Sequence, residues 1–520
     1  MNELYALEEQ VGDAGEPPLG APGPGFGFYP SYHALWHLKE IGVVRDLTSF
    51  ESSAWDLAEA RRAEGAPPTR VALVDVSVAY AHPNLEHAIA KELMIDFFSS
   101  RLGTFPKPAP DDGRLKAFLS QASEKKKLVP AGAVADLFDE LCSEFLGEYR
   151  RAREANWSDP LHVAPATSPT FSAHGTAMAG LIGARPRGPS EVRTVSAFHI
   201  ADDGQPVPEP PEAVGFPYVG VDPFCEIVPI STSFDPDPEQ LILALLYAWL
   251  IDADVVVLAR DLADPLRTVD RPDVSDADIL RSYPVEFSAR ELALWADLRE
   301  LTLALSREVP VVCAAGNGSD EPLLYPASLA SEEGNGIIAV GARAATGQRA
   351  GYSSTGDEPG GVTVYAPSGD GERLDDRLQR LDSADAGFRP SDHSALYVSQ
   401  LGVQYAADGR GRAEGPSAFA TQEIVSTDVP GSAGYNTSAF GRPTGMGGIL
   451  DYRSYYCHFS GTSAACAITA GALSLAISAG IMPRDRLDPL EAKRRLAGCA
   501  QPDDSLGAPY LSWDSLAGSA

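Results

Sequence analysis

Short apolar runs alternate with longer amphipathic stretches along most of the chain. Residues 70–76 form a Val-rich run after a Gly/Pro breaker at 65–68, which is typical of a buried parallel strand. Further strands are expected at residues 194–200, 226–231, 253–258, 309–314 and 336–340, and helices at 53–64, 239–251 and 288–307. This alternation predicts βαβ units, and therefore a mainly parallel sheet with helices on both faces.

Two longer apolar runs need a separate test, because they approach the length of a membrane span. Residues 241–259 contain Asp252 and Asp254, and residues 466–482 are rich in Ala, Gly and Ser. The second run is also shorter than the roughly 20 residues that a spanning helix requires. Both runs predict buried core segments, so we expect no membrane partner.

The composition narrows the function further. The 520 residues include 41 Lys and Arg against 72 Asp and Glu, which gives a net charge of −31. Binding to nucleic acid or anionic lipid requires clustered basic residues, so both are disfavoured. The N-terminus lacks a signal-peptide pattern, and the six cysteines form no CxxC pair. These features predict buried free thiols and a cytoplasmic protein.

Four polar residues stand where the predicted elements meet. Asp75 ends the first strand, Asn317 follows the 309–314 strand, His174 opens a helix of small residues, and Ser463 begins an apolar helix. Ligands bind at the carboxyl ends of parallel strands, which makes all four candidates for a site. Each has a structural alternative: a turn or cap for Asp75, Asn317 and Ser463, and a satisfied core or surface residue for His174.

Taken together and in this order, the four segments resemble the motifs of the subtilisin-like serine peptidases, the subtilase family. They read VALVD at 71–75, HGT at 174–176, AAGN at 314–317 and GTS at 461–463. The resemblance implies a three-layer subtilisin-like α/β fold enlarged by insertions. We expect a peptidase domain over residues 53–520, preceded by an N-terminal extension, residues 1–52, with a Pro/Gly-rich arm.

The same resemblance implies the site chemistry. Ser463 is the expected nucleophile, His174 the general base, and Asp75 the residue that orients the imidazole. The amide of Asn317 and the backbone N–H of Ser463 are expected to stabilise the oxyanion. Two other histidines are weaker candidates: His458 has no matching position in the family, and His82 matches one that we interpret as structural.

The chain departs from the family pattern at two places. Val76 and Ser77 follow Asp75 where the family has a hydroxyl residue and then Gly, which removes a hydrogen bond to the carboxylate. The usual Ser-Leu-Gly substrate segment is replaced by residues 259–261. The resemblance implies that five residues contact the substrate, namely Ala259, Arg260, Asp261, Ala315 and Gly316. Asp261 predicts that the pocket for the residue before the scissile bond prefers Arg or Lys, or is narrowed to small residues. The alternative is that the Asp261 side chain turns outward.

Four insertions are expected, at about residues 95–168, 261–288, 368–420 and 431–456. The first contains an amphipathic pattern that predicts a helix beside the cleft. Its apolar positions are Val134, Leu137, Leu141, Phe145 and Tyr149. The insertions could cover the cleft, dock a regulatory protein or inhibit the enzyme; the alternative is elaboration without regulation.

No cofactor is required by this chemistry, although many members of the family bind structural calcium. Asp235, Asp237 and Glu239 offer oxygen ligands, but the same segment suits a turn before a helix. We therefore expect a selective cytoplasmic serine endopeptidase acting on proteins or peptides. The acidic charge, with nine Asp and Glu and no Lys or Arg in residues 201–240, favours basic segments near the scissile bond. The alternative is a catalytically silent module that binds peptides or partners.

Overall fold

The computed structural model describes residues 35–45, 51–103, 113–154, 173–191, 198–200, 206–208, 210, 215–216, 218–233, 236–260, 262, 288–318, 322–345, 347–356, 361–369, 424–430, 434–435, 455–499 and 509–518.

A seven-stranded parallel sheet forms the centre of the molecule, in the order β2-β5-β1-β6-β7-β8-β9. The strands are β1 (Arg70–Asp75), β2 (Ile95–Asp96), β5 (Glu226–Ser231), β6 (Val255–Leu258), β7 (Val311–Ala314), β8 (Ile337–Arg343) and β9 (Val364–Pro367). Every residue of β1, β5, β6 and β7 is buried, because helices cover both faces of the sheet. The predicted fold class is confirmed.

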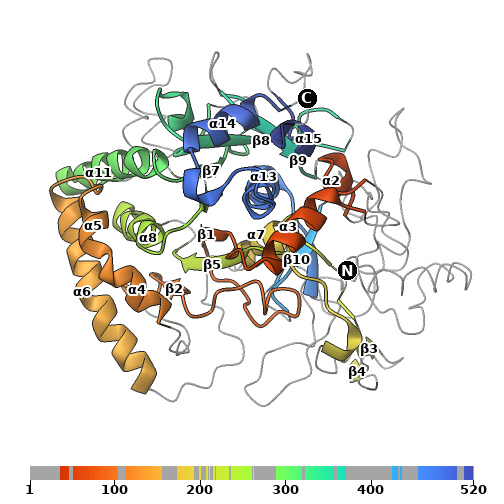
Figure 1. Cartoon of the computed structure of the whole chain (residues 1–520), viewed down its shortest axis with the longest axis horizontal. Coiled ribbons are helices and arrows are strands. Elements are labelled where there is room, and N and C mark those ends of the chain that lie inside the picture. The colour runs from red at the N-terminus through yellow and green to blue at the C-terminus, as the bar shows by residue number, and fades with distance from the viewer. Residues whose placement is uncertain are drawn as a thin grey trace, which may run out of the picture.

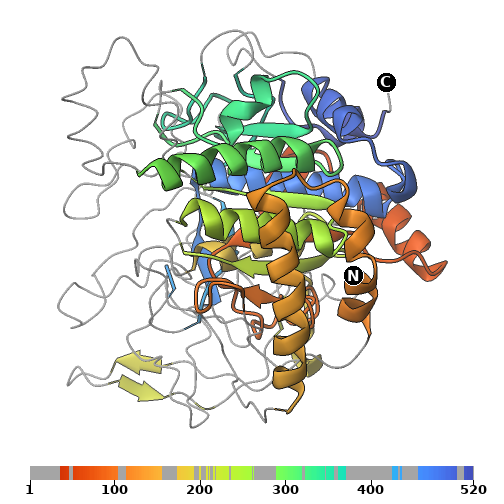
Figure 2. The same ribbon diagram turned by 90° about the vertical axis from the view of Figure 1, so that its left-hand side faces the viewer.

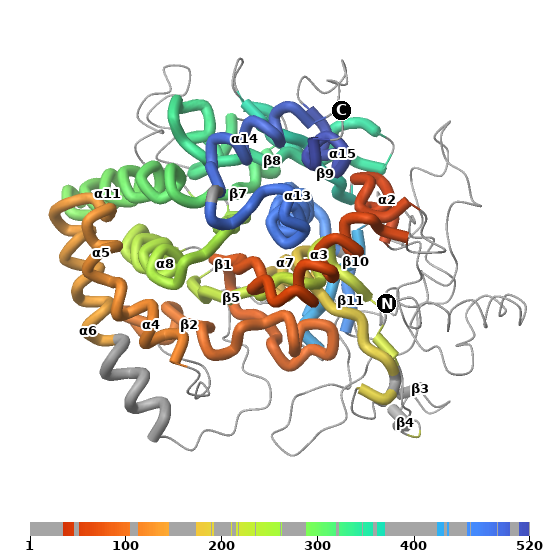
Figure 3. Tube along the Cα trace, in the orientation of Figure 1, coloured from red at the N-terminus to blue at the C-terminus, as the bar shows by residue number. Residues whose placement is uncertain are grey.

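Helices form a layer on each side of this sheet (Figure 1). One layer contains α3 (Ser53–Ala63), α7 (His174–Gly183) and α13 (Gly461–Ser478), and the other contains α8 (Pro238–Leu250) and α11 (Ala289–Ser306). Three further helices lie outside α8 and α11: α4 (Arg114–Ser120), α5 (Ala122–Lys126) and α6 (Ala133–Glu154). The tube in Figure 3 shows α13 running through the middle of the fold, beside α3 and α7.

The predicted helices begin where the sequence places capping residues. Asp237 accepts a hydrogen bond from the backbone of Gln240 at 2.9 Å and is followed by Pro238, which suits the first turn of α8. Ser288 and Glu291 form a reciprocal capping box at the start of α11. The helices expected at 53–64, 239–251 and 288–307 are therefore confirmed to within one or two residues at each end.

The two long apolar runs are core segments, as predicted. By length and composition, α13 alone among the described helices could cross a membrane, but 83% of it is buried inside the protein. The small residues allow close packing: a Cβ added at Gly471 would lie 2.7 Å from the Cβ of Val221. The whole of α8 from Leu241 to Leu250 is also buried.

One strand prediction was wrong. The 194–200 run was expected in the central sheet, but β3 (Phe198–Ile200) pairs antiparallel with β4 (Pro206–Pro208) in a separate two-stranded sheet. Figure 2 shows this hairpin well away from the central strands. A short antiparallel hairpin satisfies its backbone groups locally, and the residues of a single short run do not reveal which sheet it joins.

A second hairpin, which was not predicted, packs on α7. It pairs β10 (Val425–Thr427) with β11 (Tyr456–His458). The hydroxyls of Ser426 and Thr427 donate to carbonyls of α7, at 2.6 Å to Ala177 and 2.8 Å to Thr176. Because these bonds fix the hairpin to α7, they help to position the N-terminus of that helix.

Part of the predicted N-terminal extension packs into the domain. Residues 35–45 include α2 (Trp36–Glu40), and Leu38 and Val44 are fully buried in the core on the α13 side of the sheet. The carbonyl of Ile41 accepts a 2.7 Å hydrogen bond from Trp513, at the start of α15 (Trp513–Leu516), which follows α14 (Pro489–Ala497). The Pro/Gly-rich arm lies outside the described residues.

The helix predicted within the first insertion is confirmed as α6. Val134, Leu137 and Leu141 are buried, and α6 packs against α5, α8 and α11 (Figure 2). The side chains of Phe145 and Tyr149, and most of the other three insertions, lie outside the described residues.

Candidate active site

Residues from distant parts of the chain meet at one edge of the sheet. Asp75 is the last residue of β1, and Arg260 and Asn317 follow the ends of β6 and β7. Because these strands are parallel, their carboxyl ends share one edge. The helices α7 and α13 begin with His174 and Gly461 respectively. The predicted triad and oxyanion residues are thus supplied by two strand ends and two helix starts.

Asp75 and His174 form a buried pair. Nδ1 of His174 lies 2.9 Å from Oδ2 and 3.0 Å from Oδ1 of Asp75. Asp75 is completely buried and His174 is 5% exposed. A carboxylate only accepts hydrogen bonds, so Nδ1 carries the proton and Nε2 is the basic nitrogen of the neutral ring. This is the tautomer that a general base needs.

The surroundings of Asp75 keep it ionised. Burial raises the pKa of this carboxyl, but the charges of His174 and Arg260 and the hydrogen bonds from His174 and Val76 outweigh burial, so its pKa lies below the usual range. The backbone N–H of Val76 donates to Oδ1 at 2.7 Å. The backbone therefore supplies a donor at the position where the family pattern has a hydroxyl side chain.

Arg260 is a partner of Asp75 that the sequence did not reveal. Its Nη2 lies 3.6 Å from Oδ1 of Asp75 and 3.5 Å from Oγ1 of Thr232, and the residue is 2% exposed. We expected Arg260 to contact substrate as part of the 259–261 segment, but its side chain lies against the carboxylate. The only sequence signal was a basic residue just beyond an apolar strand.

The place of Ser463 is defined by its neighbours in the chain. Ser463 is the third residue of α13 and is 9% exposed. The ring of Phe459 packs edge-on against the His174 ring, with 5.3 Å between centroids, and Thr462 bonds to Asn317. Ser463 therefore lies in the first turn of α13, directly after the residue that bonds to the Asn317 amide and four residues after the ring that packs on the imidazole. N–H groups in a first helical turn have no partner within the helix, and they favour negative charge.

The orientation of the Asn317 amide follows from its contacts. Its Oδ1 faces the backbone N–H of Thr462 at 2.9 Å and the Thr462 hydroxyl at 3.0 Å. Since a backbone N–H can only donate, the oxygen must be on this side and the NH₂ group on the other. The backbone N–H of Gly316 donates to the same hydroxyl at 3.2 Å, which leaves that hydroxyl to donate to Asn317. Gly461 has a φ of +82°, which brings the start of α13 close to this amide.

The other four residues that were expected to contact substrate differ in burial and in their contacts. Ala259 and Ala315 are buried. The backbone of Ala315 donates to Val340 at 2.9 Å and accepts from Leu324 at 3.1 Å. Gly316 contacts Thr462 as described above. Asp261 lies outside the described residues, so its predicted role at the pocket wall stays a prediction.

His82 occupies a structural position. The backbone N–H of Asn84 donates to its Nδ1 at 3.1 Å, so Nε2 carries the proton and faces the carbonyl of Tyr455 at 2.8 Å. Burial lowers the pKa of His82 to about 3, and the ring is neutral at ordinary pH. His458 lies on β11, in register with Val425, and its side chain is outside the described residues.

The candidate calcium ligands take part in other contacts. Asp237 caps α8, and Glu239 forms an ion pair with Arg101. Asp235 falls outside the described residues. Within the described residues, no group of three or more His, Cys, Asp or Glu side chains is arranged to hold a metal ion.

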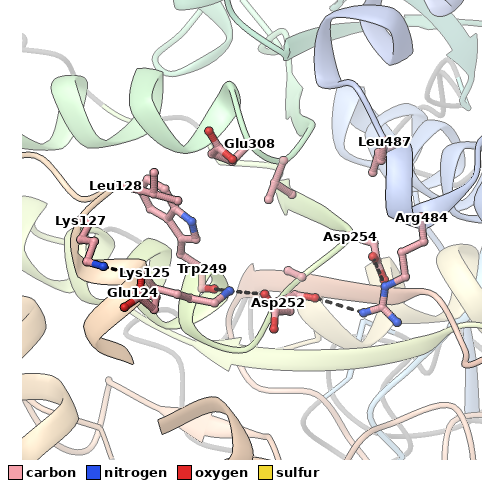
Figure 4. Close-up of a pocket in the computed structure, with 12 residues that line it drawn as sticks. Glu124, Lys125, Lys127, Leu128, Trp249, Asp252, Asp254, Glu308, Arg484 and Leu487 are labelled. Carbon is pink, nitrogen blue, oxygen red and sulfur yellow. Dashed lines mark hydrogen bonds and ion pairs between the residues drawn. The ribbon is translucent and has the colours of Figure 1, made fainter. Parts of the chain in front are cut away.

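A pocket of about 710 Å³ lies at the opposite edge of the sheet (Figure 4). It is lined by Asp254 and Val309, which precede β6 and β7, so it opens at the amino ends of these strands. An ion pair between Arg484 and Asp254, at 2.5 Å, crosses one side. Because Asp75 and Asn317 lie at the carboxyl ends, this pocket is separate from the site described above.

Comparison with known proteins places the four site segments within one family match. Residues 68–496 match the model described as the Subtilase family. No curated protein matches the chain. Similar solved structures include the nisin leader peptidase NisP from Lactococcus lactis, at 14% identity, with 93% of each chain covered and a TM-score of 0.45. The epidermin leader peptide processing protease EpiP from Staphylococcus aureus has the same identity and TM-score, with 93% of this chain and 80% of that chain covered. A lanthipeptide protease is 12% identical, with 94% and 95% covered and a TM-score of 0.44.

Proposed function

This chain belongs to the subtilase family of serine endopeptidases, and we propose that Ser463, His174 and Asp75 are its catalytic triad. The observation that carries this proposal is the contact between Nδ1 of His174 and both oxygens of the buried Asp75 carboxylate. That contact leaves Nε2 as the basic nitrogen, at the edge of the sheet where α13 presents Ser463.

The proposed reaction proceeds in two stages. His174 Nε2 removes the proton from Ser463 Oγ as this oxygen attacks the scissile carbonyl, and then delivers that proton to the leaving amine. The resulting acyl-enzyme is hydrolysed by a water molecule that His174 activates in the same way. Asp75 stabilises the imidazolium in both stages, because its pKa is held below the usual range and it carries a negative charge at neutral pH.

We propose that Asn317 and the backbone N–H of Ser463 bind the oxyanion. The amide oxygen of Asn317 is held by Thr462, so the NH₂ group is directed away from Thr462 and is available as a donor. The start of α13 adds a favourable potential for negative charge. Preorganised donors of this kind need little rearrangement as charge develops on the carbonyl oxygen.

The substrate proposed is a protein or peptide with basic residues near the scissile bond. The net charge of −31, the acidic segment 201–240 and the place of Asp261 in the 259–261 segment support it. We further propose a selective cytoplasmic processing enzyme, with a cleft restricted by its four insertions. A peptide-library profile dominated by large apolar residues before the scissile bond would contradict the basic preference.

Labelling with a fluorophosphonate probe tests the catalytic proposal. The wild-type protein should be labelled, and Ser463→Ala should not. Ser460→Ala is a matched control, because Ser460 lies in the same turn and its side chain makes no capping hydrogen bond; this variant should be labelled like the wild type. A folded wild-type protein without any labelling would instead favour a silent peptide-binding module.

A further inference from the structure

Oxygen Oδ1 of Asp75 lies close to nitrogen atoms of three described residues. The backbone N–H of Val76 is 2.7 Å away, Nδ1 of His174 is 3.0 Å away, and Nη2 of Arg260 is 3.6 Å away. The side chains of Asp75 and Arg260 are 0% and 1% exposed. A cation therefore lies beside a carboxylate oxygen that the imidazole also contacts.

This arrangement is an electrostatic contact and not a hydrogen bond. At 3.6 Å the pair is beyond hydrogen-bond distance, but water is excluded from both partners and screening is weak. Arg keeps its charge at any pH at which the protein is folded. The contact between Arg260 and Asp75 is thus a permanent positive charge beside the acid of the triad.

We propose that Arg260 is a positioning residue that extends the activity of this protease toward acid pH, by opposing protonation of His174 through their shared partner Asp75. The inference rests on the proposed triad. Arg260 partly neutralises the carboxylate that would otherwise stabilise a protonated imidazole. Loss of this cation should therefore move the acid limb of the activity profile to higher pH.

Other described groups near the pair, on α13, after β5 and after β10, carry no positive charge. Within the described part of the chain, Cys466 of α13 and Tyr435 interact electrostatically with Asp75, and burial raises the pKa of both, so both are neutral. Thr232, which follows β5, contributes an uncharged hydroxyl. Asp428 lies behind Tyr435, and its Oδ1 accepts a 3.0 Å hydrogen bond from the Tyr435 backbone. Removal of Arg260 would therefore take away a positive charge that none of these neighbours replaces.

The test compares pH profiles of wild-type protein with Arg260→Met and Arg260→Lys. The readout is the rate of Ser463 labelling by a fluorophosphonate, and kcat/KM on a model peptide, between pH 4.5 and 9. Arg260→Met should move the acid limb of both profiles upward by about one pH unit, the lower end of the effect of one nearby charge. Arg260→Lys keeps the charge and should move it by less than half as much.

Arg70→Met provides a matched control. Arg70 is also buried, and it pairs with Glu226 at 2.7 Å, but it lies at the other end of β1, about 16 Å along the strand from Asp75. Its loss should lower the thermal unfolding temperature and leave the acid limb in place. If Arg260→Met does not fold, Arg260→Gln, which retains a polar group for Thr232, gives the same test.

Four outcomes separate the inference from the proposed function. A shift with Met or Gln, restored by Lys and absent in Arg70→Met, supports the role of Arg260. An unchanged acid limb in folded, labelled Arg260→Met overturns it, and so does a change confined to KM or to the residue preferred before the scissile bond. Absence of labelling in the wild type at every pH would instead overturn the triad itself.

Discussion

The amide oxygen of Asn317 accepts two hydrogen bonds from Thr462, one from its backbone and one from its hydroxyl, at 2.9 and 3.0 Å. Thr462 precedes Ser463 in α13, whereas Asn317 follows β7. The contact therefore ties the proposed oxyanion donor to the turn that presents the proposed nucleophile. Two sets of substitutions can separate the anchoring of the amide from its donor role.

Asn317→Asp should abolish most of the activity while preserving the anchor. The new carboxylate can still accept both bonds from Thr462, but it cannot donate to an oxyanion and it adds a negative charge. We expect kcat to fall by at least about 100- to 1000-fold, the usual effect of losing one such donor. Steady-state kinetics on a model peptide measure this loss, and thermal unfolding should show a change of less than about 1 kcal/mol.

Asn317→Ala is the companion variant, because it removes the donor and the anchor together. Its loss of kcat should be similar, with a somewhat larger loss of stability. Activity in either variant close to that of the wild type would show that Asn317 does not bind the oxyanion.

Thr462→Val should affect stability more than the chemical step. This change removes the hydroxyl that accepts from Gly316 at 3.2 Å and leaves that buried N–H without its partner. We expect a cost of about 1 to 3 kcal/mol in unfolding free energy. The backbone bond to Asn317 remains, so kcat should fall by about tenfold or less. Thr462→Ser retains the hydroxyl and should restore stability; failure to do so would mean that the methyl group, and not this bond, is important.

The parts of the fold that sequence reasoning predicted are those with strong local signals. Three predicted segments with a clear apolar pattern and clear end residues closely match β5, α8 and α11. They are residues 226–231, 239–251 and 288–307. β2, β10 and β11 are two or three residues long, too short for any periodicity. The 194–200 run was assigned to the wrong sheet because its pairing with β4 depends on the hairpin and not on its own residues.

In the candidate site, too, the residues with a local signal could be predicted, whereas a contact between distant segments could not. Asp75, His174, Asn317 and Ser463 could be identified because each residue type carries a chemical role at the end of an element. The contact between Arg260 and Asp75 could not be identified in this way. It depends on the pairing of β1 with β6, where Leu73 lies opposite Val257, and on which side the chain turns after the strand. Neither is encoded in the local pattern.

Asp222→Asn should stabilise the protein at neutral pH but not in acid. Asp222 is fully buried, accepts from Ser474 and Ser478 at 2.6 and 2.8 Å, and has a pKa raised by burial. A raised folded-state pKa means that its contribution to stability is present below the unfolded-state pKa and is lost as pH rises through the folded-state value. The loss is about 1.4 kcal/mol for every pH unit between the two values.

The Asn variant carries no charge at any pH and avoids this loss, while the two serine hydroxyls can rotate to accept from its amide. Thermal unfolding at pH 7.5 should therefore show Asp222→Asn to be more stable than the wild type, with the difference disappearing near pH 4. A variant that is less stable at pH 7.5 would show that the charge of Arg185, which favours the ionised carboxylate, compensates for its burial.

His37→Leu should stabilise the protein, and more so in acid. His37 lies in α2, fully buried, and neither ring nitrogen has a hydrogen-bond partner among the described residues. An unpaired buried polar atom costs about 1 to 3 kcal/mol, so an apolar side chain of similar volume should raise the unfolding free energy at pH 7.5. Burial also lowers the pKa of His37 to about 3. As pH falls from the unfolded-state pKa of 6.5 toward 3, the unfolded chain binds a proton that the folded protein does not. The unfolding free energy therefore falls by about 1.4 kcal/mol per pH unit.

His82→Leu is the control that isolates the cause. His82 is equally buried and its pKa is also about 3, but both of its nitrogens are bonded, to Asn84 and Tyr455. At pH 7.5 its replacement should destabilise the protein, because two buried backbone groups lose their partners. Between pH 7.5 and pH 5, both Leu variants should gain about 2 kcal/mol relative to the wild type, since each removes one buried histidine that resists protonation. Equal effects of the two substitutions at pH 7.5 would contradict the role assigned to the unpaired nitrogens of His37.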